Sequence, residues 1–209
     1  FYEKGVKILG GCCGTSPEYI AALKKHFENT EVKENIEIVK GVISGATSTV
    51  VLNEPRVIGE RINPTGKKKF KEALERNDLD YILNEGISQV EAGADILDVN
   101  VGHSGIDEEE MMQKVVSSLQ GSIGLPLQLD STSPKVLEKA LRIYTGKAII
   151  NSVNGEEESL SSVLPLAKKY GAAIVGLTLD EDGIPETAEK RVEIAEKIIN
   201  RAMELGIPK

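Results

Sequence analysis

Four short apolar runs, each closed by carboxylate or amide side chains, constrain the fold of this chain more than any other feature. They span residues 56–63, 94–100, 126–131 and 148–152. Strands buried on both faces read as nearly continuous Val, Ile and Leu, which is typical of parallel sheets. A parallel barrel meets its ligands at the C-terminal ends of its strands. We therefore expect six polar residues at these ends to converge: Glu60, Asn63, Asp98, Asn100, Asp130 and Asn151.

The segments between these runs have helical spacing. Apolar stripes with a period of three to four residues predict helices that cover 79–90, 111–119, 137–144 and 160–167, and a fifth strand and helix follow over 172–179 and 187–205. This alternation, without an early glycine-rich phosphate loop, favours an α/β chain of the (β/α)8 TIM-barrel type over a dinucleotide-binding fold. Eight βα units need about 250 residues. We therefore expect an incomplete barrel of five units, in a segment of a longer protein.

The beginning of the chain predicts a separate strand–loop–helix unit. Residues 6–9 are apolar, the glycine-rich residues 10–14 must turn, and residues 15–18 (Thr-Ser-Pro-Glu) have the hydroxyl, proline and acid that open a helix. The helix should continue to about residue 29, and residues 36–52 suit an extended linker or a small hairpin. We expect three parts: residues 1–29 as the last unit of one barrel, a linker over 30–55, and the incomplete second barrel over 56–209.

Charge and hydropathy exclude several classes of function. The chain has 25 basic and 33 acidic residues, a formal net charge of −8 and a sequence pI of about 5.0, without a basic stripe interleaved with aromatic residues. Nucleic acid is therefore not an expected partner. No apolar stretch approaches the roughly 18 residues of a membrane span, and the first residues lack a signal-peptide pattern. We expect a cytoplasmic protein.

Two adjacent cysteines, Cys12 and Cys13, lie in the sequence Gly-Gly-Cys-Cys-Gly-Thr. A disulfide between neighbours in sequence is strained, so a secreted disulfide framework is not expected. Metal binding is one interpretation, because zinc takes thiolate ligands and a catalytic zinc has three protein ligands and one open position. The pair would supply two of the three. The alternative is two small packing residues at a strand end.

The carboxylates and amides at the strand ends suit a flat, neutral heterocycle with both donors and acceptors along its edges, such as a pterin. An aspartate can accept hydrogen bonds from a ring N–H and an exocyclic amine together, and an asparagine can donate or accept. Each residue also has a structural alternative. Asn100 and Asn151 could stabilise turns or cap helices, Asp130 could be an N-cap, and Glu60 could pair with a nearby arginine.

These motifs resemble those of a known family. Residues 10–15 resemble the last zinc-ligand motif of the homocysteine-binding barrel in the cobalamin-dependent methionine synthase family. Residues 59–66, 93–100, 129–131 and 150–152 resemble the pterin-binding barrel that this family shares with corrinoid methyltransferases and dihydropteroate synthase. The order of zinc motif, linker and pterin barrel is more specific than any single motif.

The resemblance implies a methyltransferase of methionine biosynthesis. In that family, the folate barrel binds 5-methyltetrahydrofolate and gives its N5 methyl to cob(I)alamin carried by another module. Methylcobalamin then methylates zinc-activated homocysteine to give methionine. The resemblance makes Cys12 and Cys13 zinc ligands and Asp130 and Asn151 the catalytic residues at the pterin edge. The other pterin-contacting or supporting residues it implies are Glu60, Asn63, Asp98 and Asn100.

The same resemblance sets the expected partners and the alternatives. The partners are 5-methyltetrahydrofolate, homocysteine and a cobalamin-binding module, and the segment alone is expected to be inactive. One alternative is another pterin-binding protein, either a corrinoid-linked methyltetrahydrofolate methyltransferase or a dihydropteroate synthase. The other is a folate-binding module without activity of its own.

Overall fold

The computed structural model describes residues 6, 8–30 and 41–208, and the chain divides into two units, residues 1–40 and residues 41–209. In the first unit, helix α1 (Pro17–Phe27) begins where it was predicted, with Pro17 in its first turn. Ser16 is the N-cap residue, but its hydroxyl donates to the carboxylate of Glu18 and caps no backbone N–H. The helix buries none of its residues within this unit.

The strand predicted over residues 6–9 is not observed. Residues 6, 8 and 9, which are the described part of that range, have no strand structure, and the Ile8 side chain is 90% exposed. A strand needs a neighbour to accept and donate its backbone hydrogen bonds. Within residues 6 and 8–30 there is no second strand that could supply them.

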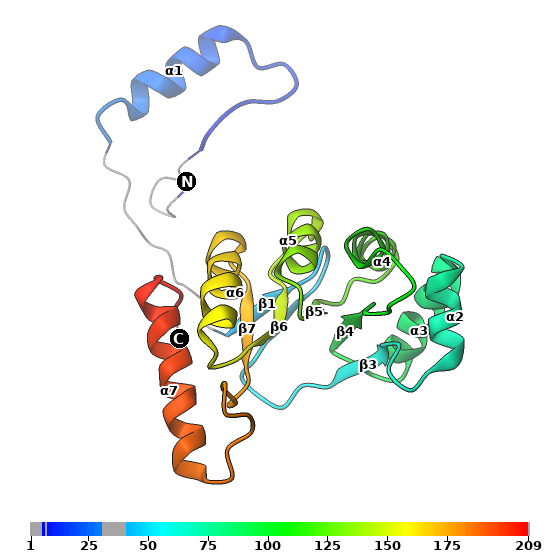
Figure 1. Cartoon of the computed structure of the whole chain (residues 1–209). Coiled ribbons are helices and arrows are strands. Elements are labelled where there is room, and N and C mark those ends of the chain that lie inside the picture. Colours follow the sequence, from blue (N-terminus) through cyan, green and yellow to red (C-terminus); the bar gives the residue numbers. More distant parts are fainter. Residues whose placement is uncertain (1–5, 7, 31–40, 209) are drawn as a thin grey trace. The chain divides into compact units, whose positions relative to one another are not determined.

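The second unit contains a five-stranded, all-parallel sheet whose strands follow one another in chain order. The strands are β3 (Ile58–Ile62), β4 (Ile96–Asn100), β5 (Leu127–Asp130), β6 (Ile149–Val153) and β7 (Ala173–Gly176). Helices follow every strand: α2 (Lys68–Glu75), α3 (Leu79–Glu91), α4 (Glu108–Ser122), α5 (Pro134–Ile143), α6 (Glu157–Tyr170) and α7 (Ala188–Glu204). Figure 1 shows α4, α5 and α6 side by side along one side of the sheet. These five successive βα units confirm the predicted incomplete barrel.

Helix α2 was not predicted. Its sequence begins with a run of lysines, which hides a narrow apolar stripe formed by Phe70, Ala73 and Leu74. All three side chains are buried. Their spacing of three and four residues was the available signal for the helix. Of the helices in the described residues, none combines the length and apolar character needed to cross a membrane.

Alternation along the strands divides the sheet into two faces with different chemistry. Leu97, Val99, Leu129 and Ile150 belong to the main core, which the helices cover. Since successive side chains of a strand point to opposite faces, the residues between them face the inside of the barrel. These inward residues are apolar at the start of the strands and polar toward their C-terminal ends.

A hairpin of β1 (Val42–Ser44) and β2 (Thr49–Val51) closes the N-terminal end of the barrel. Ile43 is fully buried and packs against Ile96 and Ile149, the first residues of β4 and β6. Ser44 and Lys147 exchange backbone hydrogen bonds of 3.0 and 3.1 Å. The hairpin is one of the two structures predicted for residues 36–52. Because it fills the N-terminal end, the polar site at the opposite end has an apolar floor.

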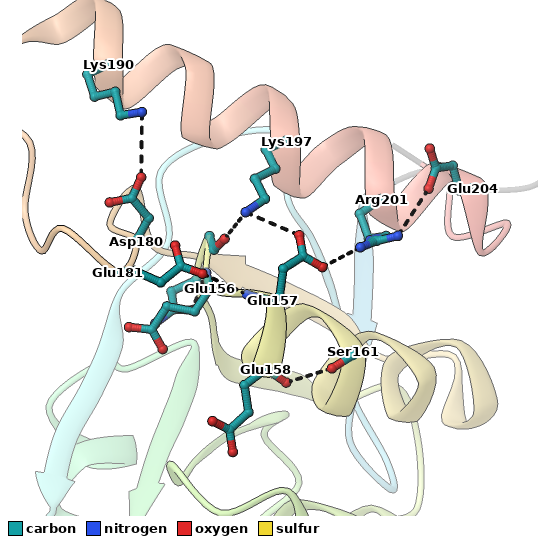
Figure 2. Close-up of polar contacts among 12 residues, drawn as sticks. Glu156, Glu157, Glu158, Ser161, Asp180, Glu181, Lys190, Lys197, Arg201 and Glu204 are labelled. Carbon is teal, nitrogen blue, oxygen red and sulfur yellow. Dashed lines mark hydrogen bonds and ion pairs between the residues drawn. The ribbon is translucent and has the colours of Figure 1, made fainter.

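Helix α7 contacts α6 and carries both buried isoleucines and ion pairs. Figure 2 shows the ion pairs. Ile194 and Ile198 are its buried residues. Lys197 Nζ donates to the Gly155 carbonyl at 2.5 Å and lies 3.3 Å from Glu157, which Arg201 also contacts at 2.5 Å. Partly exposed ion pairs contribute little net stability. We therefore attribute the attachment of α7 mainly to the isoleucines and its orientation to the charges.

Candidate functional site

The C-terminal ends of β4, β5 and β6 bring four of the predicted polar residues together. Asn100, Asp130 and Asn151 are neighbours in register across the three strands, and Asp98 lies one inward position below Asn100. Asn100 Nδ2 donates to Asp130 Oδ2 at 2.9 Å, and Asn151 Nδ2 donates to Asp98 Oδ1 at 3.4 Å. Each amide therefore has a carboxylate partner on another strand.

Asp98 is the most buried member of this group, with 1% of its surface exposed. Its Oδ1 atom accepts a hydrogen bond from Gln128 Nε2 at 2.6 Å in addition to the Asn151 contact. Its Oδ2 atom is buried and has no partner among the described residues. Buried polar atoms are nearly always paired, so an exception at a barrel mouth indicates a place for a donor from a ligand.

Burial and neighbouring negative charges raise the pKa values of both Asp98 and Asp130. Burial raises the pKa of Asp98 to about 6, and the charges of Asp130 and Glu60 add to the rise, while hydrogen bonds from Gln128 and Asn151 oppose it. Burial also raises the pKa of Asp130, opposed by the bond from Asn100 and reinforced by Glu60 and Glu108. Perturbed carboxylates that gather in one place are typical of functional sites.

The raised pKa of Asp98 makes the stability of the fold depend on pH. An unfolded aspartate has a pKa of about 3.9, so between pH 4 and 6 the folded protein binds the extra proton and its stability falls as the pH rises. Asp98→Asn removes this titration. We expect the free energy of unfolding of Asp98→Asn, minus that of the wild type, to increase by about 2–3 kcal/mol between pH 4 and 7.

Urea unfolding of both proteins across this pH range measures the difference. Contributions from titrating groups that do not interact with Asp98 cancel in the comparison. Two parallel stability curves would show that Asp98 titrates normally and would contradict the burial argument.

Glu60 and Asn63 are placed differently from the central four residues. Glu60 is exposed on β3, close enough for its charge to raise the pKa of both Asp98 and Asp130. Asn63 Oδ1 accepts from the Thr65 N–H at 2.9 Å and so stabilises its own turn. In the part of the chain that the structure describes, no hydrogen bond links Asn63 to the central four.

The structural alternatives considered for single residues are partly realised. Asn100 Oδ1 accepts from the Gly102 N–H at 2.8 Å, so Asn100 stabilises a turn while its Nδ2 contacts Asp130. Asp130 is not an N-cap, since α5 begins after Ser133. The arginine beside Glu60, Arg61, pairs with Glu85 at 3.3 Å.

Ser131, Glu108 and Gln128 also contribute contacts in this region, and the sequence analysis did not predict them as site residues. Ser131 Oγ donates to Glu108 Oε1 at 2.6 Å and accepts from the Ser133 N–H at 3.1 Å, which joins the β5 end to the start of α4. Gln128 contacts Asp98 from β5. A signal for Gln128 was present, because it lies two residues before Asp130 in an apolar strand and so shares its face.

Cys12 and Cys13 belong to the first unit, and both are exposed. Their sulfur atoms are 3.7 Å apart. Two thiolates bound tetrahedrally to one zinc at about 2.3 Å would lie about 3.8 Å apart, so the pair fits two zinc ligands. The Cys13 backbone N–H and thiol hold the pKa of Cys12 below its ordinary value. Across residues 6, 8–30 and 41–208, no group of three or more His, Cys, Asp or Glu side chains could hold a metal.

The chain matches two known families. Residues 59–209 match the family described as pterin binding enzyme, and residues 1–27 match homocysteine S-methyltransferase. The chain is 37% identical over 210 residues to the methionine synthase of Mycobacterium tuberculosis and 36% identical to that of Mycobacterium leprae. Each match covers 95% of this chain but only 17% and 18% of the relatives, less than a fifth of their length. The resemblance to methionine synthase predicted from the motifs is confirmed.

Solved structures of similar fold include dihydropteroate synthases. The enzyme from Clostridium difficile, solved in the presence of pteroic acid, superposes with a TM-score of 0.59 at 22% identity, covering 75% of this chain and 62% of that one. The enzyme from Vibrio fischeri gives a TM-score of 0.60 at 16% identity, with coverage of 80% and 64%. At this level of identity the likeness concerns the fold alone.

Proposed function

This chain belongs to the pterin binding enzyme family, and we propose that its barrel binds 5-methyltetrahydrofolate as the methyl donor of a methionine synthase. The observation that carries the proposal is the group of Asp98, Asn100, Asp130 and Asn151 at the ends of β4, β5 and β6. Within this group, the buried Oδ2 atom of Asp98 has no hydrogen-bond partner among the residues that the structure describes. A pterin edge offers ring and exocyclic N–H groups to such acceptors, and a carbonyl to amide donors.

The polar residues have separate tasks in this proposal. Asp130 accepts from the pterin edge, and Asn100 holds its Oδ2 atom in place. Asn151, oriented by Asp98, lies at the mouth and donates to N5 or orders a water there, which makes the amine a better leaving group when the methyl departs. The apolar floor formed by Ile43, Ile96 and Ile149 excludes water from the N-terminal end of the barrel.

The remaining parts of the reaction are proposals from the family. We assign Cys12 and Cys13 as two zinc ligands, and zinc when bound would lower the pKa of the homocysteine thiol. Cobalamin, carried by another module, would accept the methyl group. The domain limits expected from the sequence, 1–29, 30–55 and 56–209, are retained in this proposal, as is a cytoplasmic location.

Asn151→Ala tests the catalytic part of the proposal. We expect methyl transfer from 5-methyltetrahydrofolate to a separately supplied cobalamin-binding module to slow by about 30-fold, equal to about 2 kcal/mol, because one hydrogen bond to a charged transition state is lost. Stopped-flow absorbance of the cobalamin measures the rate. Asn84→Ala, on the exposed surface of α3, is the matched control. An unchanged rate in Asn151→Ala would remove Asn151 from the mechanism.

The fold is shared with dihydropteroate synthases, so the alternative function to be tested is condensation of a pterin pyrophosphate with 4-aminobenzoate. We expect no dihydropteroate to form in an assay with those two substrates. A corrinoid-linked methyltransferase of another pathway would transfer the methyl group without using homocysteine. A folate-binding module without activity would bind 5-methyltetrahydrofolate but transfer no methyl even when the cobalamin module is added.

A further inference from the structure

Gln128 is a polar residue in a place where an apolar one would be expected. It lies in the middle of β5 between Leu127 and Leu129, and only 7% of its surface is exposed. Its Oε1 atom is buried and has no partner among the described residues. Burying an amide with one group unpaired is unfavourable. The cost indicates that the other end of the amide has a role.

The other end of the amide contacts Asp98. Asp98 and Gln128 are direct neighbours in register on β4 and β5, and Gln128 Nε2 donates to Asp98 Oδ1 at 2.6 Å. Asn151 of β6 donates to the same oxygen at 3.4 Å. Both donors therefore use Oδ1, and Oδ2 has no partner within residues 6, 8–30 and 41–208.

We propose that Gln128 is a positioning residue that fixes the Asp98 carboxylate through Oδ1, so that Oδ2 is presented to a donor N–H of the bound pterin. This inference rests on the proposed function, and it adds a residue that the family motifs did not indicate. Gln128 acts through Asp98 and forms no part of the reacting atoms.

The neutral amide suits this task better than a charged donor. A lysine or arginine at the same place would form a buried ion pair with Asp98 and hold its pKa low. Gln128 supplies a directional donor without a charge, and the carboxylate keeps the full negative charge that a pterin N–H meets. The other charged groups that act on Asp98 are Asp130 and Glu60, both acidic, so Gln128 and Asn151 are its stabilising contacts.

The test compares Gln128→Met, which keeps the length of the side chain, with Gln113→Met on α4, whose amide contacts only the backbone of its own helix. The titration of the Asp98 carboxyl carbon is followed by NMR without ligand. We expect its pKa to rise by about one unit in Gln128→Met and to stay unchanged in Gln113→Met. An unchanged Asp98 titration in folded Gln128→Met would overturn the inference.

Binding of 5-methyltetrahydrofolate to the full chain at pH 7.5 gives the second readout. We expect about 10-fold weaker binding in Gln128→Met, because the hydrogen bond that orients the Asp98 carboxylate is lost. If Gln128→Met binds 5-methyltetrahydrofolate as tightly as the wild type does, the positioning role is overturned and the proposed function stays intact. A folded wild type that binds neither as this chain nor when extended through an eighth barrel strand would instead overturn the proposed function.

A measurement on the wild type covers the case in which Gln128→Met does not fold. The side-chain NH2 signals of Gln128 are recorded in a 15N spectrum from pH 5 to 8. We expect them to shift with the same midpoint as the Asp98 carboxyl, since the two groups share a hydrogen bond. Gln128 signals whose chemical shifts do not change as Asp98 titrates would overturn the inference.

Discussion

Asp130→Ala is expected to weaken the binding of 5-methyltetrahydrofolate by about 1000-fold, equal to about 4 kcal/mol. The carboxylate accepts two donors of the pterin edge in the proposed complex, and a hydrogen bond to a charged group contributes about 1.5–3 kcal/mol. The substitution also leaves the Asn100 amide without its partner. Isothermal titration calorimetry of the wild type and the variant measures the loss.

The control for this variant is Asp80→Ala, which removes an exposed carboxylate from the first turn of α3. It should leave the affinity unchanged, and circular dichroism should show that both variants are folded. An Asp130→Ala protein that is folded and binds as well as the wild type would remove Asp130 from the pterin site.

Ile43→Ala is expected to lower the free energy of unfolding by about 4 kcal/mol. The side chain is fully buried, because it packs against Ile96 and Ile149 under the polar site. Removing it loses the transfer free energy of its methyl and methylene groups and leaves a cavity between the hairpin and the sheet. Denaturant unfolding followed by circular dichroism measures the change.

Val51→Ala, at the end of the same hairpin, is the matched control for Ile43→Ala. Val51 is 38% exposed, and its truncation should change stability by less than about 0.5 kcal/mol. Equal, small effects of the two substitutions would mean that the hairpin does not close the barrel and that the site has no apolar floor.

The sheet and its polar ends could be predicted because the sequence states them locally. The strand around Ile96 and Leu97 is a short apolar run that ends in Asp98 and Asn100, and the next two runs end in the same way. Parallel strands carry these ends to one edge, so Asp98, Asn100, Asp130 and Asn151 could be grouped without a structure. The helices were recognisable by their apolar stripes for the same reason.

Features that depend on contacts between distant segments could not be predicted. The burial of Ile43 requires Ile96 and Ile149, which are more than 50 residues away in the chain. The unpaired oxygen of Asp98 depends on how Gln128 is oriented across two strands. The strand predicted over residues 6–9 failed because an apolar run forms a strand only beside a partner strand. Whether Cys12 and Cys13 bind zinc stays a prediction.

The most direct test of the pterin site is a calorimetric titration of the folded 209-residue chain with 5-methyltetrahydrofolate. We expect saturable binding of one ligand per chain. Where the titration shows no heat, it is repeated on a chain extended through an eighth barrel strand. A folded protein that binds no 5-methyltetrahydrofolate in either form would contradict the assignment of Asp98, Asn100, Asp130 and Asn151 to a folate site.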